Sequence, residues 1–167
     1  GADVDGDGLS DVVVGRPYHN VFIGEVRIFL GASIGGGGGA RYTIADADVV
    51  ITAPSAGVSD ARAQTGQSVA SLGDIDGDGT DDLIIGSSFG VSSTEAGMAH
   101  VVVGSQLGGV SLSLDDAAYV LHGEALGDDA GHRVALGGDV DGDGRIDLLV
   151  GARGAPTLGG SANAGRV

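Results

Sequence analysis

Short apolar runs, each three residues long and bounded by Gly or polar residues, recur along this chain of 167 residues. They consist of Val, Ile and Leu, so they are rich in β-branched side chains. Runs of this length and composition predict β-strands that cross a buried layer. The clearest examples are residues 12–14, 83–85, 101–103 and 148–150.

Glycine supplies 34 of the 167 residues, without the three-residue period of collagen. A composition this rich in Gly is often disordered. Here 42% of the residues are hydrophobic and they are gathered into the runs above, which argues for a packed core. We therefore assign the glycines to turns of an all-β protein, where a positive φ is often required.

A nine-residue acidic segment, Asp-x-Asp-Gly-Asp-Gly-x-x-Asp, occurs three times, beginning at Asp3, Asp74 and Asp139. An apolar run and then a Gly follow each copy. Matching segments precede the second and third copies, at residues 66–73 and 131–138. The copies begin 71 and 65 residues apart (74 − 3 and 139 − 74). These spacings exceed the ~40–50 residues of WD40 and kelch repeats. The chain is thus built from an internal repeat of a longer type.

The similarity between repeats continues beyond the acidic segments. Residues 24–31 match 97–104, residues 48–52 match 118–122, and Gly165–Val167 resembles the opening of another copy. Each unit holds about four short strands, which is typical of antiparallel propeller blades. We predict an all-β fold of four-stranded β-propeller blades in an incomplete ring of about two and a half blades.

The predicted units are a partial blade at 1–56, a complete blade at 57–127 and a partial blade at 128–167. A closed propeller needs at least four blades. We therefore expect the chain to be part of a longer protein. An alternative is that several copies assemble through their blade edges, since unpaired edge strands invite association.

The repeat resembles the FG-GAP repeat of integrin alpha-subunit propellers and their bacterial relatives. The resemblance rests on Gly66-Gln67-Ser68-Val69-Ala70, the following Asp-x-Asp-Gly-Asp-Gly, the apolar run and its closing Gly. Thr65-Gly66 and Ala130-Gly131 occupy the Phe-Gly positions. The resemblance implies that calcium loops occupy one face and that ligands approach the opposite face. By that analogy the recognition loops are residues 16–23, 54–65, 87–96 and 123–130.

The acidic segments have the residues that calcium requires, because this hard cation takes about six to eight oxygen ligands. Carboxylates at alternate positions of a tight loop can all point inward, and a Gly at position 6 permits the turn. We predict three Ca²⁺ sites, with side chains from positions 1, 3, 5 and 9 and a backbone carbonyl from position 7. The ligands are Asp3, Asp5, Asp7, Leu9 and Asp11; Asp74, Asp76, Asp78, Thr80 and Asp82; Asp139, Asp141, Asp143, Arg145 and Asp147.

A helical EF-hand is the main alternative for such a loop. It needs a Glu at position 12 and flanking helices. Position 12 is Val14, Ile85 or Val150 here, each inside a predicted strand. The loops are therefore expected to join two strands of one blade. Mg²⁺ is less suited, because it keeps several of its waters.

The formal charge of −15 argues against nucleic acid as a partner. No run of about 18 apolar residues is present, so no membrane insertion is predicted within this segment. The four His residues follow no catalytic pattern, and no nucleophile-elbow sequence is present, so we predict no enzyme activity. The four histidines are His19, His100, His122 and His132.

These observations favour a calcium-stabilised propeller module at the cell surface or outside the cell, used for adhesion or protein–protein interaction. Its expected partner is a protein or cell-surface ligand. Two alternatives stay open: a carbohydrate-binding propeller, and an accessory domain of a secreted enzyme. The first is ranked lower because the chain has no Trp and only three Tyr and three Phe to stack on sugars.

Overall fold

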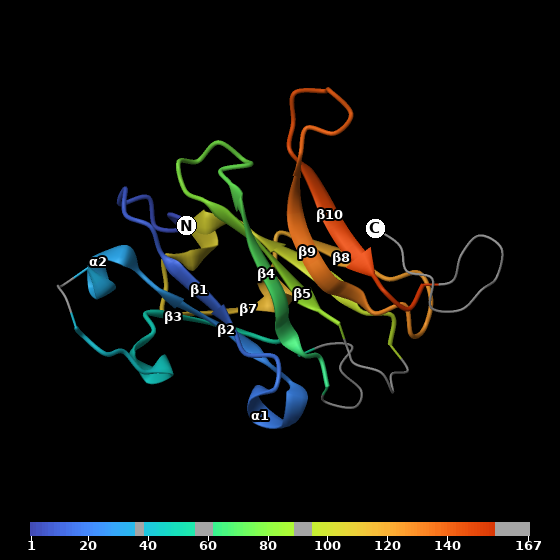
Figure 1. The fold of residues 1–167 in the computed structure, drawn as a ribbon, viewed down its shortest axis with the longest axis horizontal. Coiled ribbons are helices and arrows are strands. Elements are labelled where there is room, and N and C mark those ends of the chain that lie inside the picture. The colour runs from blue at the N-terminus through green and yellow to red at the C-terminus, as the bar shows by residue number, and fades with distance from the viewer. Residues whose placement is uncertain (36–38, 56–61, 89–94, 156–167) are drawn as a thin grey trace.

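The structure, a computed structural model, describes residues 1–35, 39–55, 62–88 and 95–155. Within these residues the chain forms three β-sheets of four, four and two strands (Figure 1). Only short helical turns accompany them. The all-β prediction is confirmed. The predicted match between Gly165–Val167 and an earlier repeat lies outside the described residues.

The first sheet has the strand order β1-β2-β3-β7. Strands β1 (Val12–Gly15), β2 (Glu25–Phe29) and β3 (Val49–Thr52) pair antiparallel. The fourth strand, β7 (Ser111–Ser113), runs parallel to β3 and comes from much later in the chain. The sequence pattern predicted the first three strands but not β7.

The second sheet is a four-stranded antiparallel meander in the order β4-β5-β6-β8. Its strands are β4 (Thr65–Gly73), β5 (Asp82–Ser87), β6 (Met98–Val102) and β8 (Tyr119–His122). This arrangement is the four-stranded blade that the repeat predicted.

The third sheet is a hairpin of β9 (Ala130–Gly138) and β10 (Asp147–Ala152). It repeats the β4–β5 hairpin, since the two hairpins share strand lengths of nine and six residues. In both hairpins an acidic loop connects the strands. Loop 1 (residues 3–11) precedes β1, loop 2 (74–82) joins β4 to β5, and loop 3 (139–147) joins β9 to β10.

Short helical segments occupy the connections between strands. The turn α1 (His19–Phe22) lies between β1 and β2, and α2 (Gly31–Ile34) follows β2. Three single 3₁₀ turns lie in the described connections before β3 and on either side of β7. These are η1 (Ile44–Asp46), η2 (Gly104–Leu107) and η3 (Leu114–Asp116).

The sheets pack face to face, and β5 shows how. Side chains of a strand point alternately to opposite faces. Leu83 and Ile85 accordingly enter the core shared with the first sheet, whereas Ile84 enters the core shared with the third. All three are fully buried. The uninterrupted apolar run of β5 therefore reflects a sheet that is covered on both faces.

The three stacked sheets do not close into a ring, so the described residues form part of an all-β propeller. Strand β7 lies in the predicted unit 57–127 but completes the sheet of the unit 1–56. The repeat boundaries themselves stay predictions. No helix in the described part of the chain is both long and apolar enough to cross a membrane.

Candidate metal centres

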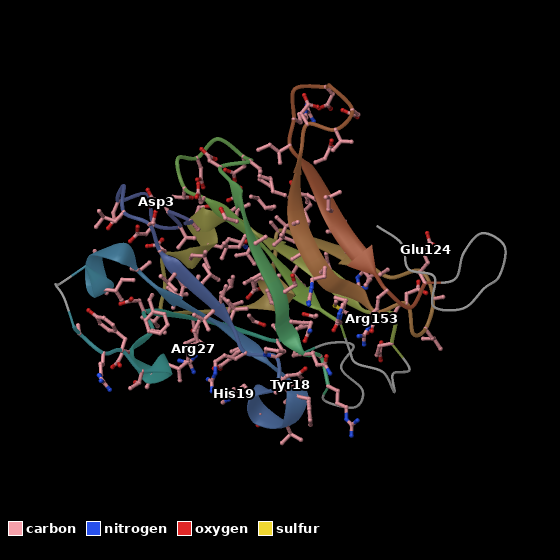
Figure 2. All side chains as sticks on the ribbon, viewed as in Figure 1. Asp3, Tyr18, His19, Arg27, Glu124 and Arg153 are labelled. Atoms are coloured by element: carbon pink, nitrogen blue, oxygen red, sulfur yellow. The ribbon has the colours of Figure 1, made fainter. Side chains whose placement is uncertain are left out.

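The three acidic loops project from the same end of the stacked sheets (Figure 1). The turn α1 lies at the opposite end of the first sheet. In Figure 2, Asp3 marks the loop end, while Tyr18 and His19 mark the other. The topology thus brings together three segments that are far apart in the sequence.

Each loop closes in the same way, because the same backbone groups donate to the same aspartates. The position 6 N–H donates to the position 1 carboxylate at 2.9–3.0 Å. The position 5 N–H donates to position 3 at 3.1–3.2 Å, and the position 7 N–H donates to position 5 at 2.7–2.9 Å. Such side-chain-to-backbone bonds favour turns over regular structure.

The glycines at loop positions 4 and 6 permit this closure. All six have φ between +73° and +94°, a conformation that other residues adopt only at a cost. The Asp-Gly-Asp-Gly motif that all three loops share therefore combines inward-pointing carboxylates with the glycine turns that direct them. The pairs are Gly6 and Gly8, Gly77 and Gly79, and Gly142 and Gly144.

Three carboxylates in each loop approach closely enough to share one cation. Their oxygen atoms lie within 4.8 Å of one another. Two oxygens that ligate the same Ca²⁺ at about 2.3–2.6 Å can be at most about 5 Å apart. The groups are Asp3, Asp5 and Asp11; Asp74, Asp76 and Asp78; Asp139, Asp141 and Asp147.

The remaining predicted ligands lie in the loops but outside these close groups. Positions 1 and 3 belong to the group in every loop, whereas Asp7, Asp82 and Asp143 do not. The position 7 residues Leu9, Thr80 and Arg145 each donate their N–H to the position 5 carboxylate. Ligation through their carbonyl oxygens stays a prediction.

Position 9 has a structural role that the sequence did not reveal. Asp11 is buried, and its two carboxylate oxygens accept the N–H groups of Val4 and Gly31, each at 2.7 Å. Asp82 repeats this arrangement with Ile75 at 3.0 Å and Gly104 at 2.8 Å. These carboxylates tie the loop to the segment that follows the second strand after it, β2 for loop 1 and β6 for loop 2.

The charge within the loops is only partly balanced by protein groups. Burial and the neighbouring charges of Asp7, Asp11 and Asp3 raise the pKa of Asp5. Burial likewise raises the pKa of Asp82, against two backbone hydrogen bonds. In loop 1, the buried Oδ1 of Asp3 has no hydrogen-bond partner. Clustered carboxylate oxygens, one of them unpartnered, fit a hard divalent cation.

One residue that sequence reasoning missed is Asp81, at position 8 of loop 2. Its carboxylate accepts the backbone N–H of Asp3, which belongs to loop 1, at 3.0 Å. The signal was present in the sequence, since loop 2 alone carries an acidic residue at position 8. Only the packing of neighbouring sheets shows what that residue reaches.

Comparison with known proteins identifies the repeat. The family model for the FG-GAP repeat matches two segments, residues 65–102 and 130–167. Each segment contains one acidic loop with the strands on either side of it. FG-GAP repeats are therefore present at two places in this chain.

The chain is also similar to integrin alpha subunits. Integrin alpha-5 of Xenopus laevis is 31% identical over 172 residues, which cover 93% of this chain and 14% of that protein. Integrin alpha-7 of Rattus norvegicus is 32% identical over 156 residues, which cover 90% of this chain and 12% of that protein. Integrin alpha pat-2 of Caenorhabditis briggsae is 28% identical over 169 residues, which cover 90% of this chain and 12% of that protein.

The chain thus spans only 12–14% of the length of these relatives, which are named as integrin alpha subunits and not as enzymes. Their similarity extends over nearly all of this chain. The fold and the two repeat matches agree with the predicted FG-GAP type of β-propeller.

Proposed function

We propose that this chain is a calcium-stabilised propeller module that acts outside the cell in adhesion or protein–protein interaction. The observation that carries the proposal is the grouping of three carboxylates within 4.8 Å in each of three loops that share one hydrogen-bonding pattern. The ligand set that we propose is the one predicted from the sequence, with one Ca²⁺ in each loop.

Calcium would stabilise the fold by relieving repulsion within the loops. Each loop carries four aspartates at positions 1, 3, 5 and 9, and bringing like charges together disfavours the compact form. A divalent cation offsets two of the four charges and links the strands on either side of the loop. Binding that favours the folded state adds directly to its stability.

An extracellular setting suits these loops. Calcium loops of extracellular modules bind with dissociation constants of about 10⁻⁴–10⁻³ M, weaker than those of cytosolic buffers. The chain has no Cys, so metal ions rather than disulfides would hold its loops together. The similarity to integrin alpha subunits supports the same setting.

We place the recognition surface at the end opposite the loops, centred on Tyr18, Val21 and Phe22. These large apolar side chains are 65%, 76% and 43% exposed. The rings of Tyr18 and Phe22 pack edge to face at 5.6 Å, and the Arg62 guanidinium lies 6.0 Å from the Phe22 ring centre. Aromatic residues and Arg are enriched at the centres of protein interfaces.

The backbone of this surface is held in an unusual conformation. Asn20, Val21 and Phe22 have φ of 48°, 57° and 73°. Consecutive left-handed residues other than Gly cost free energy, and such strain is often retained where it presents side chains for function. The turn thus displays Val21 and Phe22 outward instead of packing them.

An ionic cluster around the buried Glu25 carboxylate supports the same turn. The Glu25 carboxylate contacts Arg16 and Arg27, with Arg27 Nε at 2.8 Å, and His19 Nε2 lies 3.6 Å away. Burial of Glu25 opposes its ionisation, but hydrogen bonds from the two arginines lower its pKa overall. Glu25 thereby fixes both ends of the connection between β1 and β2.

Binding of the displayed chain to cells would test the recognition surface. Beads that carry the chain should bind intact cells in millimolar calcium, and a Tyr18→Ser/Phe22→Ser variant should lose most of that binding. Val110→Ser serves as a matched control, because Val110 is 78% exposed and directly precedes β7, at the edge of the first sheet opposite β1. Equal binding by the wild type and the double variant would contradict the proposed surface.

A further inference from the structure

Loops 1 and 2 are joined by a reciprocal pair of hydrogen bonds between Asp81 and Asp3. The Asp81 N–H donates to the Asp3 carbonyl oxygen at 2.8 Å, and the Asp3 N–H donates to Asp81 Oδ2 at 3.0 Å. Ser71 Oγ also donates to Asp81 Oδ2, at 3.4 Å. Both backbone groups of Asp3 are therefore held by one residue of the neighbouring loop.

A second contact joins the same two loops. A Cβ atom built on Gly6 would lie 3.3 Å from the Gly79 carbonyl oxygen and 3.3 Å from Thr80 Cγ2. The middle of loop 1 thus rests against the part of loop 2 that includes its predicted position 7 ligand. Loops 1 and 2 therefore contact each other at two places.

Loop 3 has neither of these links to loop 2. Ile146 stands at the position of Asp81, and its side chain has no carboxylate to offer. Gly77 is the loop 2 counterpart of Gly6, yet a Cβ atom on Gly77 would meet nothing within 4 Å. Among the described residues, no hydrogen bond joins Ile146 to Asp74.

We propose that Asp81 is a positioning residue that couples cation binding at loop 1 to cation binding at loop 2, while loop 3 binds its cation independently. This inference rests on the calcium sites of the proposed function. It adds an interaction between two of the sites that the repeat pattern alone would make equivalent.

The coupling follows from the place of each residue in its loop. Asp81 lies between Thr80 and Asp82, two predicted ligands of loop 2, so a cation that fixes those residues also fixes Asp81. Asp3 is the position 1 ligand of loop 1, with Oδ2 bound to the Gly8 N–H and Oδ1 unpartnered. Ordering Asp81 therefore orders Asp3. Binding free energies couple reciprocally, so loop 1 aids loop 2 equally.

Site-resolved calcium titration tests this coupling. The amide NMR signal of Gly8 reports on loop 1, and loop 2 is disabled by Asp76→Asn/Asp78→Asn. We expect this double variant to weaken calcium binding at loop 1 by about five- to tenfold, a common size for coupling between sites. The matched Asp141→Asn/Asp143→Asn variant disables loop 3 and should change loop 1 affinity by less than about twofold, since no coupling energy is involved.

Substitution of Asp81 completes the thermodynamic cycle. In the Asp81→Ala background, loop 1 affinity should no longer depend on whether loop 2 is intact. Asp81→Asn keeps an oxygen acceptor for the Asp3 N–H and should keep most of the coupling, which separates hydrogen bonding from charge. Amide hydrogen exchange without calcium gives a further readout, because Asp81→Ala should speed exchange at Asp3.

The outcomes separate the coupling from the calcium sites themselves. If loop 1 binds calcium with the same affinity whether loop 2 is intact or disabled, the coupling is overturned. The calcium proposal would still stand. An equal loss on disabling loop 2 or loop 3 also overturns the coupling, because charge alone then explains the effect. Absence of any calcium response at all three loops overturns both.

Discussion

Gly86 of β5 lies so close to Gly131 of β9 that a Cβ atom on Gly86 would overlap the Gly131 carbonyl oxygen. Gly15 of β1 and Gly66 of β4 are related in the same way. In the first two repeats, the glycine that closes the apolar run therefore contacts a glycine at the start of the next hairpin. Both recur in the repeat because neighbouring sheets approach backbone to backbone at this point.

Replacing Gly86 by Ala should therefore destabilise the fold. Because the obstacle is a backbone carbonyl, relief requires the sheets to separate, and we expect a loss of about 3 kcal/mol in the free energy of unfolding. Gly151→Ala is the matched control at the same repeat position, where the nearest atom to a Cβ is 3.4 Å away. Urea unfolding of both variants checks the prediction, and equal losses would contradict it.

Neutralising Glu25 should cost stability at neutral pH. Glu25→Gln leaves Arg16 and Arg27 without their carboxylate, and because both arginines are partly exposed we expect a loss of about 1–2 kcal/mol. The lowered pKa of Glu25 means that the native carboxylate stabilises the fold above pH 4.5 and loses this effect as the pH falls through its folded value. Unfolding curves of both proteins should therefore converge in acid, whereas the exposed control Asp116→Asn should show no such loss.

His100 should make stability depend on pH in a different range. It is 1% exposed within β6, and burial lowers its pKa from 6.5 to about 4. Between these values the unfolded chain takes up a proton that the folded chain does not, so stability falls as the pH falls across this window. The full effect is about 3 kcal/mol. A His100→Gln variant should lose this part of the pH dependence, while His122→Gln on the exposed β8 should retain it.

Much of the fold followed from the sequence, because the features that determine it are local and repeated. The apolar runs at 83–85 and 148–150 became β5 and β10, and the residues around them became the predicted hairpins. Strand β7 could not be predicted in this way. Its segment, Ser111–Ser113, has little apolar character, and it forms a strand only because the edge of β3 lies beside it.

The site was predictable in its residue types but not in its internal division of roles. The sequence makes Asp5 and Asp11 equivalent members of one acidic loop. In the structure Asp5 is exposed, whereas Asp11 is buried and binds two backbone N–H groups. That difference depends on the segment at Gly31, which is distant in the sequence. The link from Asp81 to Asp3 escaped prediction for the same reason.

Substitution in loop 2 can separate the proposed cation-binding role of an exposed aspartate from the structural role of the position 9 aspartate. Asp82→Ala removes the acceptor of the Ile75 and Gly104 N–H groups and should destabilise the chain by about 2 kcal/mol even in a chelator. Asp76→Ala removes an exposed carboxylate and should reduce stability only when calcium is present. Thermal unfolding of both variants in calcium and in EGTA distinguishes these cases. A loss for Asp76→Ala in EGTA equal to that of Asp82→Ala would contradict the assignment.

Thermal unfolding of the unmodified chain in calcium and in EGTA tests the central claim most directly. At about 100 times the dissociation constant, calcium would add about 2.7 kcal/mol per occupied site. Each kcal/mol corresponds to roughly 2–4 °C for a chain of this size. We predict that calcium raises Tm by at least about 5 °C over EGTA. An equal concentration of magnesium should have a smaller effect. The same Tm in calcium and in EGTA would contradict the account.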